Sequence, residues 1–105
     1  MKKPPKPINV SLEQVEAGRF KITGMLNFDS VPQVWQQSQA LFRGGDSLVI
    51  DFSGVTHSDS AGLALLMEWL REARAKRQTL RFHLIPAQML EIARVCGVEQ
   101  DLPAG

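Results

Sequence analysis

Leu48-Val-Ile-Asp-Phe-Ser-Gly-Val-Thr-His-Ser-Asp-Ser-Ala-Gly-Leu-Ala-Leu-Leu66 is the stretch around which the rest of the chain can be placed. It opens with an apolar run that is rich in β-branched residues and broken only by Asp51, which is typical of a strand buried on both faces of a sheet. Helix-forming residues begin at Leu63, so a polar corner at residues 57–62 joins this strand to a helix. Such a corner lies at the carboxyl edge of the sheet, where α/β proteins commonly place functional sites.

The composition indicates one soluble domain. A chain of 105 residues with 44% apolar residues is enough for one core and too short for two. Its net charge of +1, without a basic patch, does not favour nucleic acid as a partner. No apolar run approaches the roughly 18 residues of a membrane-spanning helix, so direct membrane insertion is not expected. The single cysteine, Cys96, excludes an internal disulfide, fits a reducing cytoplasm, and is expected to be a small buried residue.

The first residues differ in composition from the rest. Residues 1–7 hold three lysines and three prolines, and no apolar core follows them as it would in a signal peptide. We expect a disordered basic, Pro-rich tail at 1–7 and a single domain at 8–105.

A hairpin and a helix precede the central strand. Alternating apolar residues at 8–15 and 20–24, separated by Ala17-Gly18, predict two antiparallel strands. Ser30 and Gln33 have the spacing of a capping box, with Pro32 in the first turn of the helix and Gly44-Gly45 after its end. One face of this helix carries the residues expected in the core, which are Val31, Val34, Trp35, Ser38, Leu41 and Phe42.

A second helix is predicted at about residues 59–77. Helical spacing places four residues towards the sheet, namely Leu63, Leu66, Leu70 and Ala73. Leu65 falls nearly opposite them, beside Glu68, so we predict that Leu65 is exposed and belongs to a partner-binding surface.

The chain ends with a strand and a short helix. Leu80, Phe82 and Leu84 alternate with polar residues as in a strand, and Pro86 begins a helix that runs to about Cys96 with Gly97 as its left-handed cap. The order of elements is therefore ββαβαβα. It predicts an α/β fold with a mixed, mostly parallel sheet of four to five strands.

The polar corner is not predicted to be catalytic. His57, Asp59 and Ser60 are neighbours on one turn and cannot usually reach the nucleophile–base–orienter geometry of a triad. Two histidines and one cysteine make a weak zinc site, and no phosphate-binding loop or cofactor motif is present. Ser60 could carry a phosphate or contact a partner at the start of the helix. Alternatively, Asp59 and Ser60 only cap the helix.

Residues 48–63 closely resemble the core of the STAS domain, the fold of anti-sigma-factor antagonists. Asp59-Ser60-Ala61-Gly62-Leu63 matches the family's D-[ST]-x-G-[LI] turn, and residues 93–98 match its late helix–glycine pattern. The resemblance covers about residues 8–102. It implies the STAS fold and makes Ser60 the phosphorylation or partner-contact position.

Within this family, Gly62-Leu-Ala-Leu-Leu66 and Asp101-Leu-Pro103 resemble the stand-alone STAS subunit of Mla-type ABC phospholipid transporters. The resemblance implies a non-enzymatic cytoplasmic subunit that binds the transporter ATPase, and through it the permease, at the inner membrane. Outer-membrane lipid asymmetry depends on such a transporter. The residues expected to bind the partner are Ser58, Asp59, Ser60, Ala61, Gly62, Leu65 and Glu68.

Two other functions remain open. An anti-sigma-factor antagonist would use the same surface, with Ser60 phosphorylated by a partner kinase. A small hydrolase would need a catalytic base near Ser60 in space, and the sequence offers only His57 and His83.

Overall fold

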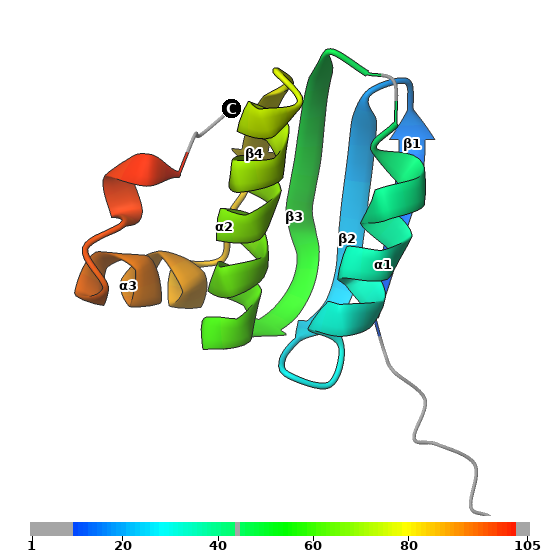
Figure 1. The fold of residues 1–105 in the computed structure, drawn as a ribbon. Helices are drawn as coiled ribbons and strands as arrows, with labels where there is room; N and C mark the ends of the chain where they lie inside the picture. The colour runs from blue at the N-terminus through cyan, green and yellow to red at the C-terminus, as the bar shows by residue number, and fades with distance from the viewer. Residues whose placement is uncertain (1–9, 44, 103–105) are drawn as a thin grey trace, which may run out of the picture.

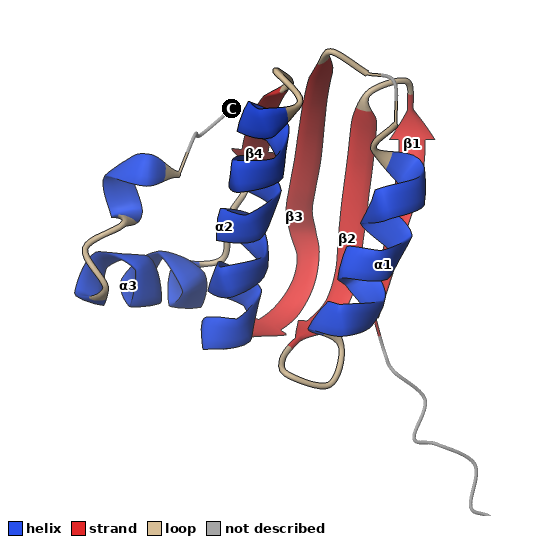
Figure 2. Cartoon of the chain, in the orientation of Figure 1, coloured by secondary structure: helices blue, strands red, loops and turns tan. Residues whose placement is uncertain are grey.

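The computed structural model describes residues 10–43 and 45–102. The predicted tail at 1–7, the predicted start of the first strand at residue 8 and the predicted role of Gly44 lie outside these residues. Strands and helices follow one another as the sequence predicts (Figure 2). The elements are β1 (Val10–Glu16), β2 (Arg19–Leu26), α1 (Val31–Leu41), β3 (Ser47–Ser58), α2 (Ser60–Ala75), β4 (Thr79–His83), α3 (Ala87–Val95) and the 3-10 turn η1 (Glu99–Asp101).

The four strands form one mixed sheet in the order β1-β2-β3-β4. The β1–β2 hairpin is antiparallel, and β2, β3 and β4 are parallel to one another, which confirms the predicted architecture. Helices connect the parallel strands, as parallel pairing requires. Leu26 and Ser58 are register partners at the ends of β2 and β3, so the segments that follow both strands start at the same edge of the sheet.

The helices lie on one face of this sheet. Figure 1 shows α1 in front of β1 and β2, and α2 in front of β4 and beside β3. The core fills the layer between sheet and helices, and its most completely buried large side chains are Phe20, Phe52, Phe82, Ile22, Leu26, Ile50, Leu66 and Met89. The prediction that the central strand is buried on both faces is therefore wrong. Leu48, Ile50 and Phe52 are buried, whereas Val49 and Asp51 point to the uncovered face and are partly exposed.

β3 is longer than the apolar run predicts. It continues through residues 53–58, because β2 extends to Leu26 and offers backbone partners to Gly54, Val55 and His57. Two register irregularities absorb the mismatch between the strands. The polar corner thus begins only at Asp59.

α1 begins where the sequence predicts, but its cap differs. The Ser30 hydroxyl donates to the Met25 carbonyl at 2.7 Å and accepts from the Asn27 amide at 3.0 Å, so it makes no hydrogen bond with the helix. The predicted capping box with Gln33 is wrong, because Ser30 closes the preceding loop instead. Pro32 lies in the first turn, as expected.

The last elements differ from prediction at two residues. β4 ends at His83, and Leu84 is 70% exposed with a positive φ of 58°, so it is not a buried strand residue. Cys96 is exposed, because it caps α3 on the side away from the core. Gly97 has the predicted positive φ, and Val98 and Leu102 pack against the core. None of the helices in the described ranges is long and apolar enough to span a bilayer.

Candidate functional site: the corner before α2 and the groove beside it

The corner between β3 and α2 is held by short polar contacts. Asp59 is the N-cap of α2, and its carboxylate accepts a hydrogen bond from the Ala61 amide at 2.8 Å. The Asp59 amide in turn donates to the Leu26 carbonyl at 3.1 Å, which ties the corner to the end of β2. The predicted capping role of Asp59 is confirmed, and a carboxylate at this end also interacts favourably with the helix dipole.

Ser58 and Gly62 fill the space behind the corner. Ser58 is 3% exposed, and its amide donates to the Gln88 side chain at 3.4 Å. A Cβ at position 62 would overlap Ser58 Oγ and lie 3.2 Å from both Leu26 and Met89. The glycine of the Asp59–Leu63 turn is therefore needed for close packing of α2 against the sheet and α3.

Ser60 is the first residue of α2 and is exposed. Ala64 and Glu68 follow it at intervals of four residues and are also exposed, so the three lie along one side of the helix. Glu68 forms an ion pair with Arg71 at 2.8 Å, and this hydrogen bond raises the pKa of the Arg71 guanidinium. The exposed side of α2 thus presents a hydroxyl, a methyl group and a paired carboxylate.

A groove of about 340 Å³ runs beside this side of α2, between α2 and α1. Its walls are mostly apolar and come from both helices, with the lining residues Val31, Pro32, Trp35, Ala64, Leu65 and Glu68. Both helices begin at the carboxyl edge of the sheet (Figure 1). The groove is formed by the first two turns of α1 and by the second and third turns of α2, so its nearest α2 residue, Ala64, lies one helical turn from Ser60.

Leu65 is not exposed as predicted, since only 2% of it is accessible. The prediction considered the sheet alone as the packing partner of α2. In the structure α1 packs against the flank of α2 that carries Leu65, which becomes part of the groove wall. The α1 side of the groove is not predicted from the sequence. Trp35 packs against the core as expected, and it also lines the groove.

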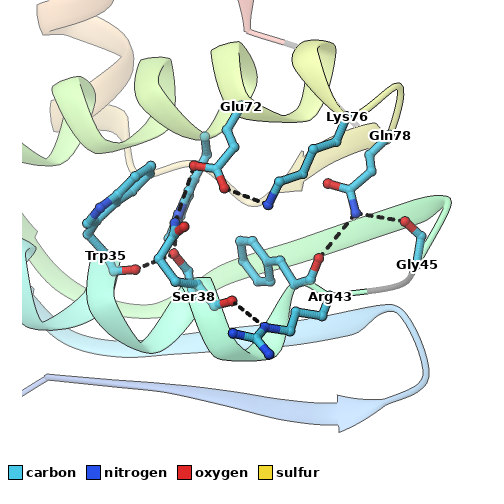
Figure 3. A network of polar contacts seen from close by, with 10 residues as sticks. Trp35, Ser38, Arg43, Gly45, Glu72, Lys76 and Gln78 are labelled. Carbon is cyan, nitrogen blue, oxygen red and sulfur yellow. Dashed lines mark hydrogen bonds and ion pairs between the residues drawn. The ribbon is translucent and has the colours of Figure 1, made fainter.

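In their later turns, beyond the groove, α1 and α2 are joined by side-chain hydrogen bonds. The Trp69 indole N–H donates to the Ser38 hydroxyl at 2.8 Å, and Ser38 donates to the Trp35 carbonyl at 2.6 Å. The Glu72 carboxylate accepts from Gln39 at 3.3 Å and from Lys76 at 2.7 Å (Figure 3).

The end of α2 is fastened as well, since the Gln78 side chain donates to the carbonyls of Phe42 at 3.1 Å and Gly45 at 2.8 Å (Figure 3). The two helices are therefore cross-linked by hydrogen bonds in their later turns, and the groove separates them nearer to the end of α2 that carries Ser60.

The seven residues predicted to bind a partner lie together, but they are not equally accessible. Ser60 and Glu68 are exposed and Asp59 is half-buried. Four others are buried and shape the surface from below, namely Ser58, Ala61, Gly62 and Leu65.

A catalytic constellation is not assembled here. His83 is level with Asp51 in the sheet, which is roughly 20 Å along β3 from Ser58. The side chains of His57, Asp59 and Ser60, all within the described ranges, form no hydrogen bond with one another. Among the described residues, no group of three His, Cys, Asp or Glu side chains is placed to hold a metal ion.

Known proteins of similar structure share this fold. The anti-sigma factor antagonist SpoIIAA in its unphosphorylated form matches with a TM-score of 0.68 at 21% identity, covering 91% of this chain and 87% of that one. An anti-sigma factor antagonist from Mycobacterium paratuberculosis matches with a TM-score of 0.72 at 20% identity, covering 98% and 89%. These similarities show a common architecture.

The sequence comparison is more specific. The chain is 30% identical over 79 residues to the intermembrane phospholipid transport system binding protein MlaB of Haemophilus influenzae, covering 71% of this chain and 75% of that protein. A family model described as the MlaB STAS domain matches residues 10–104. Because this match spans nearly the whole described fold and includes the Asp59–Leu63 turn, the chain belongs to the STAS-domain family of MlaB.

Proposed function

We propose that this protein is a non-catalytic subunit of an Mla-type ABC phospholipid transporter, which it joins by binding the transporter ATPase. The family match and the identity to a phospholipid-transport binding protein support this function. In this role the protein is cytoplasmic, reaches the inner membrane through the ATPase and its permease, and contributes to outer-membrane lipid asymmetry.

The observation that carries the proposal is the groove between α1 and α2, which begins one helical turn from Ser60. A concave, mostly apolar surface with a polar rim is the usual form of a site that receives an apolar side chain of a protein partner. Trp35 and Leu65 supply the apolar wall, and Glu68 lies at the rim. The helices are cross-linked through Ser38 and Trp69, so the groove is preformed and little ordering is needed on binding.

Ser60 has a defined place in this proposal. It stands one helical turn before Ala64, so a partner that fills the groove also covers the Ser60 hydroxyl. A phosphate or carboxylate here would add negative charge next to Asp59 without disturbing the core. The surface can therefore be weakened without unfolding the protein.

The proposal is tested by filling the groove. Ala64→Lys places a long charged side chain at the groove, whereas Ala75→Lys makes the same change at the exposed far end of α2. We expect Ala64→Lys to weaken binding to the purified ATPase–permease complex by at least about tenfold, as substitutions at central interface positions do. Ala75→Lys should bind like the wild type. Binding is measured by titration of the purified ATPase–permease complex in detergent.

Membrane capture checks the identity of the partner. The tagged protein is isolated from gently solubilised native membranes, and co-purifying proteins are identified by mass spectrometry. Recovery of an ABC ATPase with its permease by the wild type and by Ala75→Lys, and its loss with Ala64→Lys, supports the proposal. Equal recovery with Ala64→Lys would remove the groove from the interface, and absence of any ABC ATPase from the wild-type sample would overturn the function.

The second candidate is an anti-sigma-factor antagonist switched by phosphorylation of Ser60. It is favoured by the shared fold of the two antagonists and by the exposure of Ser60 at a helix start. In that case the same capture recovers a soluble kinase, and intact-mass analysis after incubation with ATP shows one added phosphate that Ser60→Ala abolishes.

A further inference from the structure

The face of the sheet opposite the helices carries a row of charged side chains. Glu13, Lys21, Asp51 and His83 are consecutive register partners across β1, β2, β3 and β4. Their neighbours along the strands, Leu12, Ile22, Ile50 and Phe82, are buried under the helices, so the alternation of a strand directs the charged row to the other face. The row crosses the whole sheet, and its charges alternate in sign from Glu13 to Asp51.

These side chains are not committed to ion pairs. Exposed charges on the helices form the pairs Arg71–Glu68, Lys76–Glu72 and Arg94–Glu91. Within residues 10–43 and 45–102, none of the row's side chains forms an ion pair, and Asp51 accepts a single hydrogen bond from the Ser53 amide. Glu13 is exposed and the other three are half-buried by their neighbours on the sheet.

The charges of this row complement those of the same row in a second copy of the chain, when that copy presents the row in the opposite order. If a second copy is placed face to face by a two-fold axis parallel to the strands, β1 lies over β4 and β2 lies over β3 of the other copy. Lys21 then faces the second copy's Asp51, and Asp51 faces its Lys21. Glu13 and His83 meet in the same way, and a carboxylate accepts a hydrogen bond from an imidazole N–H.

The neighbouring row fits the same arrangement. Arg19, Val49 and Arg81 are register partners on the uncovered face. In the two-fold arrangement Arg19 lies over the second copy's Val49, on which the aliphatic stem of the arginine can pack. Arg81 lies near the second copy's Glu16. No like charges are placed over one another in either row.

We propose that this face is a homodimer interface, in which two copies pack their sheets face to face through the Glu13–Lys21–Asp51–His83 row. Two sheets packed in this way lie about 10 Å apart with strands turned by about 30°. Lys21 and Asp51 lie next to the two-fold axis, where this rotation displaces side chains least, so they are the central contacts. The groove between α1 and α2 lies on the other side of each sheet and stays free, so the inference does not depend on the proposed function.

Charge-reversal variants can distinguish contacts between two copies from contacts within one copy. Lys21→Asp gives a row with three adjacent carboxylates, at positions 13, 21 and 51, and Asp51→Lys gives a row with two lysines. Each variant alone should dimerise much more weakly than the wild type. When the two variants are mixed, carboxylates of one face lysines of the other at both positions, so a heterodimer should form.

The oligomeric state is measured by sedimentation equilibrium up to about 100 µM, above the micromolar dissociation constants of weak specific interfaces. We expect a wild-type dimer that weakens as salt screens the row. Each reversal should weaken it by at least about tenfold, since it replaces two attractive pairs by two repulsive ones. Arg74→Asp, an exposed reversal on α2, is the control and should dimerise like the wild type.

Each outcome decides the proposal. A wild-type protein that is monomeric at about 100 µM overturns it, because no specific interface would then be present. Single-reversal variants that dimerise as tightly as the wild type would place the interface elsewhere. Folded variants that remain monomers when mixed would show that the side chains of the row do not form contacts between copies. Circular dichroism and thermal unfolding of each variant confirm that the monomers are folded.

Discussion

Gly62 shows how one residue positions the corner. Its missing side chain leaves room for Ser58 Oγ, and Leu26 and Met89 close the same space from β2 and α3. The sequence marks Gly62 as part of the Asp59–Leu63 turn. It does not indicate why a glycine is needed inside a helix, where glycine costs about 1 kcal/mol relative to alanine. The reason lies in three elements that meet only in the folded chain.

Gly62→Ala should lower the free energy of unfolding by about 2 kcal/mol, because overpacking outweighs the gain in helix propensity. The double variant Ser58→Ala/Gly62→Ala removes the oxygen that the new methyl group would overlap. It should be more stable than Gly62→Ala alone. Urea titration of the wild type, both single variants and the double variant measures this coupling. Strictly additive losses would show that Ser58 does not set the size of residue 62.

Leu65 illustrates what residue-level reasoning cannot provide. Helical spacing correctly predicts the sheet-facing residues Leu63, Leu66, Leu70 and Ala73, all of which are buried. The same spacing predicts exposure for Leu65 only if the sheet is the sole packing partner. The position of α1 depends on the length of β2 and on the loop closed by Ser30. Neither can be predicted from the sequence of α2. The burial of Leu65 therefore could not be predicted from that helix alone.

At the scale of elements, the contact between α1 and α2 at Ser38 and Trp69 holds together the two helices that line the groove. Ser38 has 0% exposure and accepts the hydrogen bond of the Trp69 indole, which is itself 2% exposed. The sequence places Ser38 within the apolar face of α1 without giving it a partner. A buried polar residue on a core-facing helix signals a hydrogen bond, but the partner is 31 residues away in the sequence.

Ser38→Ala should lower the free energy of unfolding by about 1–3 kcal/mol, because it leaves the buried Trp69 N–H without an acceptor. Ser53→Ala, at an exposed position on β3, should change it by less than about 0.5 kcal/mol. Thermal and urea unfolding measure both. Adding Trp69→Phe to Ser38→Ala removes the orphaned donor, so the second substitution should cost less in that background than in the wild type. An equal cost in both backgrounds would argue against the hydrogen bond as the link between the helices.

The order of strands and helices was predictable because each element carries its own period of apolar residues. The ends of the elements were less so. β3 extends through residues 53–58 because of backbone pairing with β2, for which the side chains give no periodic signal. Ser30 has the spacing of a capping box, yet its hydroxyl has a better acceptor in the Met25 carbonyl. Boundaries therefore depend on competing hydrogen bonds that the sequence alone does not rank.

At the scale of the whole molecule, the fold is a two-layer structure with one core and one uncovered sheet face. Among the described residues, the buried polar side chains are three serines, Ser30, Ser38 and Ser58. No ionisable side chain in those ranges is buried, so no large penalty of a buried charge opposes folding. The ionisable groups that influence stability are then partly exposed side chains that connect two elements. Glu72 is one of them.

Glu72 links α1 to α2 through Gln39 and is held by Lys76, the C-cap residue of α2 (Figure 3). The hydrogen bond from Lys76 is the main reason that the pKa of Glu72 lies below its ordinary value of 4.5, and Gln39 adds to the effect. Since the carboxylate is favoured in the folded state, it contributes stability above the unfolded-state pKa. That contribution is lost as the pH falls through the lower, folded-state pKa.

Glu72→Gln should therefore reduce the free energy of unfolding at pH 7, and the difference from the wild type should shrink as the pH is lowered through the range just below 4.5. The amide keeps the size of the side chain and can still accept a hydrogen bond, so the substitution tests the charge. Lys76→Met supplies the control. In that background Lys76 no longer lowers the pKa, so the effect of Glu72→Gln should depend much less on pH. Urea unfolding of the four proteins across this pH range is the measurement. A difference that stays constant from pH 7 to the acid limit would mean that the Glu72 charge does not stabilise the fold.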